Sequence, residues 1–140
     1  MTAHRVFLPA LAMVALTFVV WIRMYVMRIA QMKRDRIHPQ AIATSAQATA
    51  RLTDSRAADN FRNLFELPVL FYLALVVAAV CGLETLPVLV LAWLFVVLRV
   101  AHSWIHCTYN KVMHRFSAYL AGGIALWLLW IVLGYGLLRA

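Results

Sequence analysis

Apolar residues fill four long stretches of the chain, and polar residues are concentrated in the segments between them. The stretches are 6–22, 67–81, 86–98 and 116–138, and the middle two reach spanning length only when their polar ends are included. A helix crosses a bilayer with about 20 predominantly apolar residues. The pattern therefore predicts an all-α protein with four transmembrane helices at about 5–29, 56–82, 85–108 and 115–139, in one domain over 1–140.

The composition agrees with a membrane protein. The chain is 65% hydrophobic and 13% charged, whereas soluble domains carry about 25% charged residues. The first apolar run follows the basic lead MTAHR but ends in WIRMYVMR, without a small-residue cleavage site. It is therefore predicted to be a retained helix rather than a signal peptide.

The distribution of charge predicts the orientation. The end of the bundle that carries the loops at 30–58 and 108–115 has eleven lysine and arginine residues, and the other end has only Arg5 and Arg139. Basic loops stay in the cytoplasm, so both termini are expected outside it. The same charge would attract anionic lipid headgroups. No basic tail interleaved with aromatic residues is present, so no nucleic-acid partner is expected.

The connections predict the packing of the helices. The second and third helices, and the third and fourth, are joined by short segments and should be antiparallel neighbours, while the sequence AIATSAQATA in the first loop predicts weak order. Pro68 falls inside the predicted second helix and should kink it just past Glu66. Cys81 and Cys107 would lie on opposite sides of the membrane and could not pair.

Charged residues enter the second helix with its apolar run. In DNFRNLFELPVLF, Asp59, Arg62, Asn63 and Glu66 are spaced i, i+3, i+4, i+7 and would share one helix face. A charge inside a spanning helix costs about 2.5–3.5 kcal/mol on insertion scales, so it usually faces a partner or water. Glu66 is therefore either a member of a structural ion pair, with Arg62 or with an arginine of another helix, or a ligand contact.

The third helix repeats this arrangement at the same end of the bundle. Arg99, His102 and His106 are spaced i, i+3, i+7 and would also share a face. Further cations at this depth are Arg23, Arg28 and Arg115. Several cations with one carboxylate and one amide predict a pocket for a polar, anionic ligand, and the uncharged helices below it would suit a lipid-soluble second substrate.

The two histidines have other interpretations. One interpretation makes them packing or interface residues, and another makes them metal ligands four residues apart, with Glu66 completing the set. Cys107 points about 100° away from His106 on a helix, and metal sites in bundles draw their ligands from several helices, so no metal is expected.

The segment from Arg62 and Asn63 to Glu66, followed by a proline, resembles the signature of the MAPEG family, membrane-associated proteins in eicosanoid and glutathione metabolism. The similarity, to a bacterial-type member, extends over most of the chain and includes four helices, a long first loop, Arg99 three residues before His102, and Arg115. It implies a four-helix bundle that assembles as a homotrimer, with glutathione bound between subunits near the cytoplasmic face.

The resemblance also implies roles for single residues. Arg62, Asn63, Glu66 and Arg99 would hold glutathione, with His102 and His106 beside them, and Arg115 would stabilise its thiolate. The sequence departs from the eicosanoid synthases of the family at His106, where they carry tyrosine, and at Asp59, where they carry arginine. Its proline also follows Glu66 sooner, after two residues rather than three or four.

The expected function is therefore glutathione transferase or peroxidase chemistry on a lipophilic electrophile. The alternative is a non-catalytic membrane protein whose cytoplasmic pocket binds a lipid headgroup or a partner. No serine-histidine-aspartate set, phosphate-binding loop or second deep carboxylate supports a hydrolase, a nucleotide-binding protein or a glycosidase.

Overall fold

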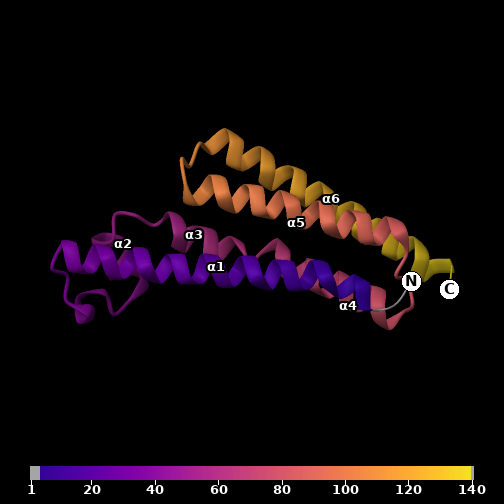
Figure 1. The fold of residues 1–140 in the computed structure, drawn as a ribbon, viewed down its shortest axis with the longest axis horizontal. Helices are drawn as coiled ribbons and strands as arrows, with labels where there is room; N and C mark the ends of the chain where they lie inside the picture. The colour runs from indigo at the N-terminus through magenta and orange to yellow at the C-terminus, as the bar shows by residue number, and fades with distance from the viewer. Residues whose placement is uncertain (1–3, 140) are drawn as a thin grey trace.

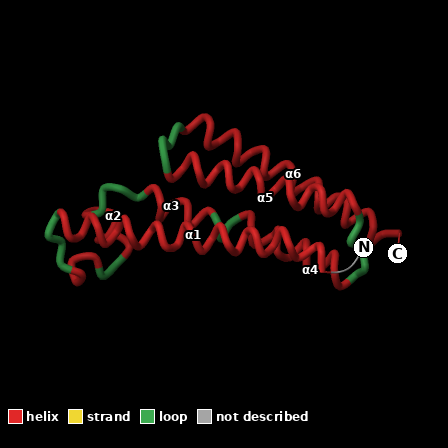
Figure 2. Tube along the Cα trace, viewed as in Figure 1, coloured by secondary structure: helices red, strands yellow, loops and turns green. Residues whose placement is uncertain are grey.

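The computed structural model describes residues 4–139, which fold into helices and short connections (Figure 2). The elements are α1 (His4–Arg34), the 3-10 turn η1 (Pro39–Ile42), α2 (Ser45–Arg51), α3 (Arg56–Asn63), α4 (Leu67–Val80), α5 (Leu86–Cys107) and α6 (Val112–Arg139). Four segments are long and apolar enough to cross a membrane: Arg5–Arg34, Arg56–Val80, Leu86–Cys107 and Val112–Arg139. Four segments of spanning length are therefore present as the sequence predicts, with α3 and α4 together forming the second.

The helices are arranged as two antiparallel pairs. One pair is α1 with α3 and α4, and the other is the hairpin of α5 and α6 (Figure 1). Both termini and the turn between α4 and α5 lie at one end, while α2 and the turn between α5 and α6 lie at the other, where the two pairs diverge. The turn between α5 and α6 therefore joins the two members of one antiparallel pair, as predicted, while the turn between α4 and α5 joins the two pairs through antiparallel helices that also contact each other.

A fully buried apolar core holds the pairs together. Phe71 of α4 stacks on Phe95 of α5 with ring centroids 4.6 Å apart, and both rings are 0% exposed. Met13 of α1 and Leu126 of α6 are also 0% exposed, so all four spans contribute to this core. Side chains on the outer faces, such as Phe18 and Trp127, remain exposed, as lipid-facing positions do.

The second span is interrupted rather than kinked where the sequence predicted. The α3 helix ends at Asn63 and α4 begins at Leu67, with Glu66 as its N-cap residue. Pro68 lies in the first turn of α4, where a missing N–H removes no helical hydrogen bond. The prediction of a kink just past Glu66 was wrong, because the break comes before Glu66 and Pro68 starts a new helix.

The first loop is more ordered than its composition suggests. Thr44 and Gln47 form a capping box, in which Gln47 N donates to Thr44 Oγ1 (3.3 Å) and Thr44 N donates to Gln47 Oε1 (3.1 Å). This pair satisfies two backbone donors at the start of α2. Gln31 Nε2 donates to Thr53 Oγ1 at 3.0 Å, and this bond connects the end of the loop to α1. The α1 helix continues to Arg34, whereas the sequence predicted an end near residue 29.

Candidate functional site

A row of polar side chains lies on the buried face of α5. Arg99 is 0% exposed, His102 2%, and Ser103 and His106 3% each. Their spacing of three and four residues places them on one side of the helix, whereas Val100 and Trp104 between them point outward. The expectation that Arg99, His102 and His106 share a face is met, and the face points into the bundle.

Arg99 connects α5 to the break in the second span. Its Nη2 donates to the backbone carbonyl of Asn63 at 2.7 Å, and its guanidinium lies 5.3 Å from the ring centroid of Tyr119 of α6. Nε and Nη1 have no hydrogen-bond partner among the described residues. A fully buried guanidinium with two unused donors is poised to receive an acceptor, because buried polar groups are nearly always paired.

The two histidines carry further unused atoms. His102 Nδ1 lies 3.1 Å from the carbonyl oxygen of Arg115 and so carries the proton in that contact, which leaves Nε2 unprotonated in the neutral ring and without a partner. His106 Nδ1 is also buried and unpartnered among residues 4–139. The two rings pack edge to face with centroids 5.6 Å apart.

Glu66 and Arg115 lie beside these groups. Tyr119 Oη donates to Glu66 Oε2 at 3.4 Å, and the Glu66 carboxylate is otherwise exposed. Arg115 is half-buried and its Nη1 donates to Asn110 Oδ1 at 2.7 Å, which leaves most of its donors unused. We call the following seven residues the polar cluster: Asn63, Glu66, Arg99, His102, His106, Arg115 and Tyr119.

Arg62 lies outside the polar cluster. It faces α1 and α2, where its Nη1 is 3.9 Å from Asp59 Oδ1 and its side chain is 72% exposed. The expectation that Asp59, Arg62, Asn63 and Glu66 share one face was wrong, because the helix ends at Asn63 and Glu66 belongs to a new one. The alternative ion pair between Arg62 and Glu66 does not form among the described residues.

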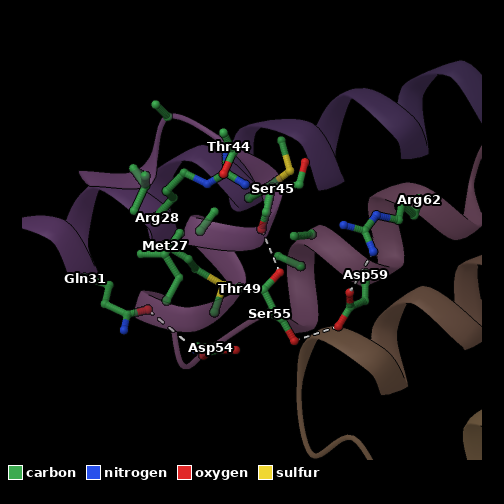
Figure 3. A pocket seen from close by; sticks show the side chains of 17 residues that line it. Met27, Arg28, Gln31, Thr44, Ser45, Thr49, Asp54, Ser55, Asp59 and Arg62 are labelled. Carbon is green, nitrogen blue, oxygen red and sulfur yellow. Dashed lines mark hydrogen bonds and ion pairs between the residues drawn. The ribbon is translucent and has the colours of Figure 1, made fainter. Parts of the chain in front are cut away.

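A cavity of about 430 Å³ lies on the Arg62 side of α3, between α1 and α2 (Figure 3). Charged side chains on its wall are Arg28, Asp54, Asp59 and Arg62, and hydroxyl groups are supplied by Thr44, Ser45, Thr49 and Ser55. Ser55 Oγ donates to Asp59 Oδ2 at 2.6 Å. Arg28 forms no hydrogen bond or ion pair with another described residue, so this cavity has an unused cation.

Asp54, at the edge of the cavity, is held by the neighbouring arginine. Arg56 Nη2 and Nε donate to the two carboxylate oxygens of Asp54 at 2.7 and 2.9 Å. These hydrogen bonds hold the pKa of Asp54 below its usual range. The carboxylate is therefore ionised and paired at neutral pH, and offers the cavity little free negative charge.

Two arginines cap the end of α5, and one of them, Arg23, is among the predicted pocket cations. Arg23 Nη2 donates to the carbonyl of Cys107 at 2.6 Å, and Arg56 Nη1 donates to that of Thr108 at 2.7 Å. The last carbonyls of a helix lack intrahelical partners and carry partial negative charge, so arginines there are stabilising. The inclusion of Arg23 among the pocket cations was therefore wrong.

A buried polar contact that was not predicted from the sequence fixes α3 against α5. Asn60 is 0% exposed. It accepts from Ser103 Oγ at 3.2 Å and donates through Nδ2 to Cys107 Sγ at 3.4 Å. The position of Asn60, three residues before Asn63 and on the same side of α3, was the available signal. Tyr119 was also missed, although it lies one turn after Arg115 on α6.

No group of three or more His, Cys, Asp or Glu side chains among the described residues is arranged to hold a metal ion. His102 and His106 instead face each other edge to face within the bundle. Cys81 and Cys107 are both free thiols, the first exposed and the second buried.

The model of the MAPEG family matches residues 6–135, a range that contains the second and third spans, nearly all of the first and fourth, and every member of the polar cluster. No curated protein and no solved structure matches the chain.

Proposed function

The chain belongs to the MAPEG family, and from this premise we propose that it is a membrane-bound glutathione-dependent transferase or peroxidase acting on a lipophilic electrophile. The proposal combines the glutathione-related activity associated with the family and the unused donors of the polar cluster. The observation that carries it is Arg99, which is completely buried and keeps two nitrogens without a partner.

The donor set suits glutathione, which has two carboxylates, an ammonium group and a thiol. Arg99 supplies unused N–H donors for a carboxylate, and Glu66 supplies an exposed carboxylate for the ammonium group. His102 and His106 add unpartnered nitrogens beside Arg99. In this proposal glutathione supplies the nucleophilic sulfur, and the outward-facing apolar surface of the helices gives the lipophilic substrate access from the bilayer.

Arg115 is proposed to favour the thiolate. A free thiol has a pKa of about 8.5 and is mostly protonated at neutral pH. Each unit by which this pKa falls requires about 1.4 kcal/mol of preferential thiolate stabilisation. Arg115 is half-buried, and only one of its nitrogens is engaged, by Asn110. A guanidinium in that state can stabilise a neighbouring anion more strongly than one in open water.

We further propose that the protein works as a homotrimer, with both termini outside the cytoplasm. Within one chain Arg62 faces α1 and α2, whereas Asn63 and Glu66 contact α5 and α6. Arg62 therefore does not reach the ligand held by its own polar cluster. In a trimer it would act on glutathione held by a neighbouring subunit, together with the unpaired Arg28.

Substitution of Arg115 tests the proposal. Arg115→Leu should retain glutathione binding but lose the ultraviolet band of bound thiolate near neutral pH, and turnover of an aromatic electrophile should fall with it. Asn110→Gly is the matched control, because it removes the partner of Arg115 without removing the cation. Glycine also suits the left-handed backbone of Asn110, whose φ is 49°.

Three results would contradict the proposal. If the wild-type protein binds no glutathione, the polar cluster serves another ligand. If it binds glutathione without a thiolate band, Arg115 does not stabilise the anion. If Arg115→Leu and Asn110→Gly lose the band equally, Arg115 acts by shaping the turn and not by stabilising the anion.

A further inference from the structure

The C-terminal end of α1 forms an open groove that the proposed glutathione chemistry does not use. The groove has a volume of about 550 Å³, and Ile29, Met32 and Ile37 form its apolar floor. Lys33, Arg36, His38 and Pro39 complete its lining. It is separate from the cavity beside Arg62, with which it shares no lining residue.

The termination of α1 builds this groove. Ile37 N donates to the carbonyl of Met32 at 2.9 Å, which is the six-to-one hydrogen bond of a Schellman motif. The motif turns Ile37 back toward Met32 and completes the apolar floor. It also requires a left-handed residue before Ile37, and this residue is Arg36, with φ 52°. Glycine is the usual residue at that position, so an arginine there is conformationally unfavourable and invites a functional explanation.

The charge at the groove is almost wholly positive. Lys33 and Arg36 form no hydrogen bond or ion pair with another residue in the described range. The neighbouring carboxylate, Asp35, is engaged by Arg34, whose Nε and Nη2 donate to it at 2.9 and 3.4 Å. Two unpaired cations therefore flank an apolar surface, and an occupant should combine an anionic group with apolar groups.

The position of the groove along α1 identifies the kind of occupant. Trp21 and Tyr25 pack edge to face on the exposed side of α1, and such aromatic residues are enriched at the level of the headgroups. Ile29 lies about one helical turn beyond Tyr25. Lys33 lies about two turns beyond Tyr25, which is about 12 Å along the helix axis. Basic residues directly beyond a spanning helix are typical of sites for anionic lipids.

We propose that this groove binds an anionic phospholipid, with Lys33 and Arg36 contacting its phosphate and the apolar floor contacting its glycerol and upper acyl region. A free phosphate ion would gain nothing from the apolar floor. A second copy of the chain would bring only one acidic group from this segment, Asp35, and Arg34 already engages it. The site does not depend on glutathione and can be tested without it.

The test uses the full chain in bilayer nanodiscs that contain phosphatidylglycerol and phosphatidylcholine in equal amounts. After gentle release, native mass spectrometry counts the molecules of each lipid retained per chain. We expect the wild-type protein to be enriched in phosphatidylglycerol. Each cation near a membrane surface contributes enough to change affinity about fivefold, so Lys33→Gln and Arg36→Gly should each reduce the enrichment by about that factor.

Arg36→Gly separates binding from folding. Because glycine adopts a left-handed backbone without strain, this variant should unfold at the same or a higher denaturant concentration while it loses lipid enrichment. Arg51→Gln is the matched control, since Arg51 is an exposed cation of the same loop that lines neither cavity. It should leave the enrichment unchanged.

Three outcomes would overturn the proposal. The first is equal retention of both lipids by the wild-type protein. The second is a loss of enrichment in Arg51→Gln as large as that in Arg36→Gly, which would indicate a general effect of net charge. The third is displacement of the bound lipid by inorganic phosphate at concentrations too low to screen exposed charges such as that of Arg51. This would indicate a site for the free ion. None of these outcomes bears on glutathione binding, so failure here is distinguishable from failure of the proposed function.

Discussion

Asn60 offers the sharpest test of how the break in the second span is held in place. Its side chain is fully buried and links α3 to two residues of α5, Ser103 and Cys107. Asn60→Ala would remove the acceptor of the Ser103 hydroxyl. A buried polar group left without a partner costs about 1–3 kcal/mol, and we expect a loss of unfolding free energy in this range.

The contact itself can be measured by a double-mutant cycle. Interhelical hydrogen bonds in membrane proteins contribute about 0.6 kcal/mol on average and up to about 1.7 kcal/mol in such cycles. We expect a coupling between Asn60→Ala and Ser103→Ala toward the upper part of that range, because both side chains are nearly inaccessible. Ser103 can also donate to the carbonyl four residues earlier in α5, which limits the cost of losing Asn60.

The assay is reversible unfolding in mixed micelles of a mild detergent and dodecyl sulfate, followed by circular dichroism. The reasoning is refuted if the two substitutions add within about 0.3–0.5 kcal/mol, the usual limit for independent sites. Glutathione binding to the same variants then tests whether the contact positions Asn63 and Glu66. A stable Asn60→Ala protein with unchanged binding would show that the contacts from Arg99 and Tyr119 hold the break without Asn60.

Three further predictions concern other parts of the molecule. Glu66→Gln should weaken glutathione binding while leaving the apo protein close to wild-type stability, whereas equal destabilisation with and without ligand would indicate a structural role through Tyr119. Hydrogen bonds from Arg56 lower the pKa of Asp54 in the folded state. The stability that this pair provides is therefore present above the unfolded pKa of about 3.9 and is lost as the pH falls through the lower, folded pKa. Unfolding midpoints measured against pH should decline less steeply at acid pH for Asp54→Asn than for the wild-type protein. A detergent-corrected mass should correspond to three chains, and a stable monomer with full glutathione binding would contradict the proposed trimer.

The fold was predictable from the sequence because the bilayer imposes a simple requirement on it. A spanning helix must be long and apolar, so the four runs identified the four spans, and their short connections identified the antiparallel neighbours. The buried face of α5 was also predictable, because Arg99, His102 and His106 recur at helical spacing. These features depend on residues that are close in the sequence.

The features that sequence reasoning missed depend on distant residues. Arg99 reaches the carbonyl of Asn63 across 36 positions, and Arg23 reaches the carbonyl of Cys107 across 84. Nothing in a local pattern states which cation will cap a helix end and which will remain free. The same holds for Arg62. Its side chain and that of Glu66 do not share a helix face, because the helix ends between them.

The cations at this end of the bundle differ in what they contact, and this difference explains why the charge excess alone could not locate the site. Arg23 and Arg56 donate hydrogen bonds to the last carbonyls of α5, so their substitution should affect stability more than ligand binding. Arg99 contacts the break in the second span and retains unused donors inside the bundle, whereas Lys33 and Arg36 lie unpaired beside an outward apolar groove. An anionic ligand that is small and polar should therefore respond to Arg99 and Arg115, and an anionic lipid to Lys33 and Arg36. A substitution of Arg115 thus serves as the control for the lipid groove, and a substitution of Arg36 as the control for the polar cluster. Both remove positive charge from the same end of the molecule.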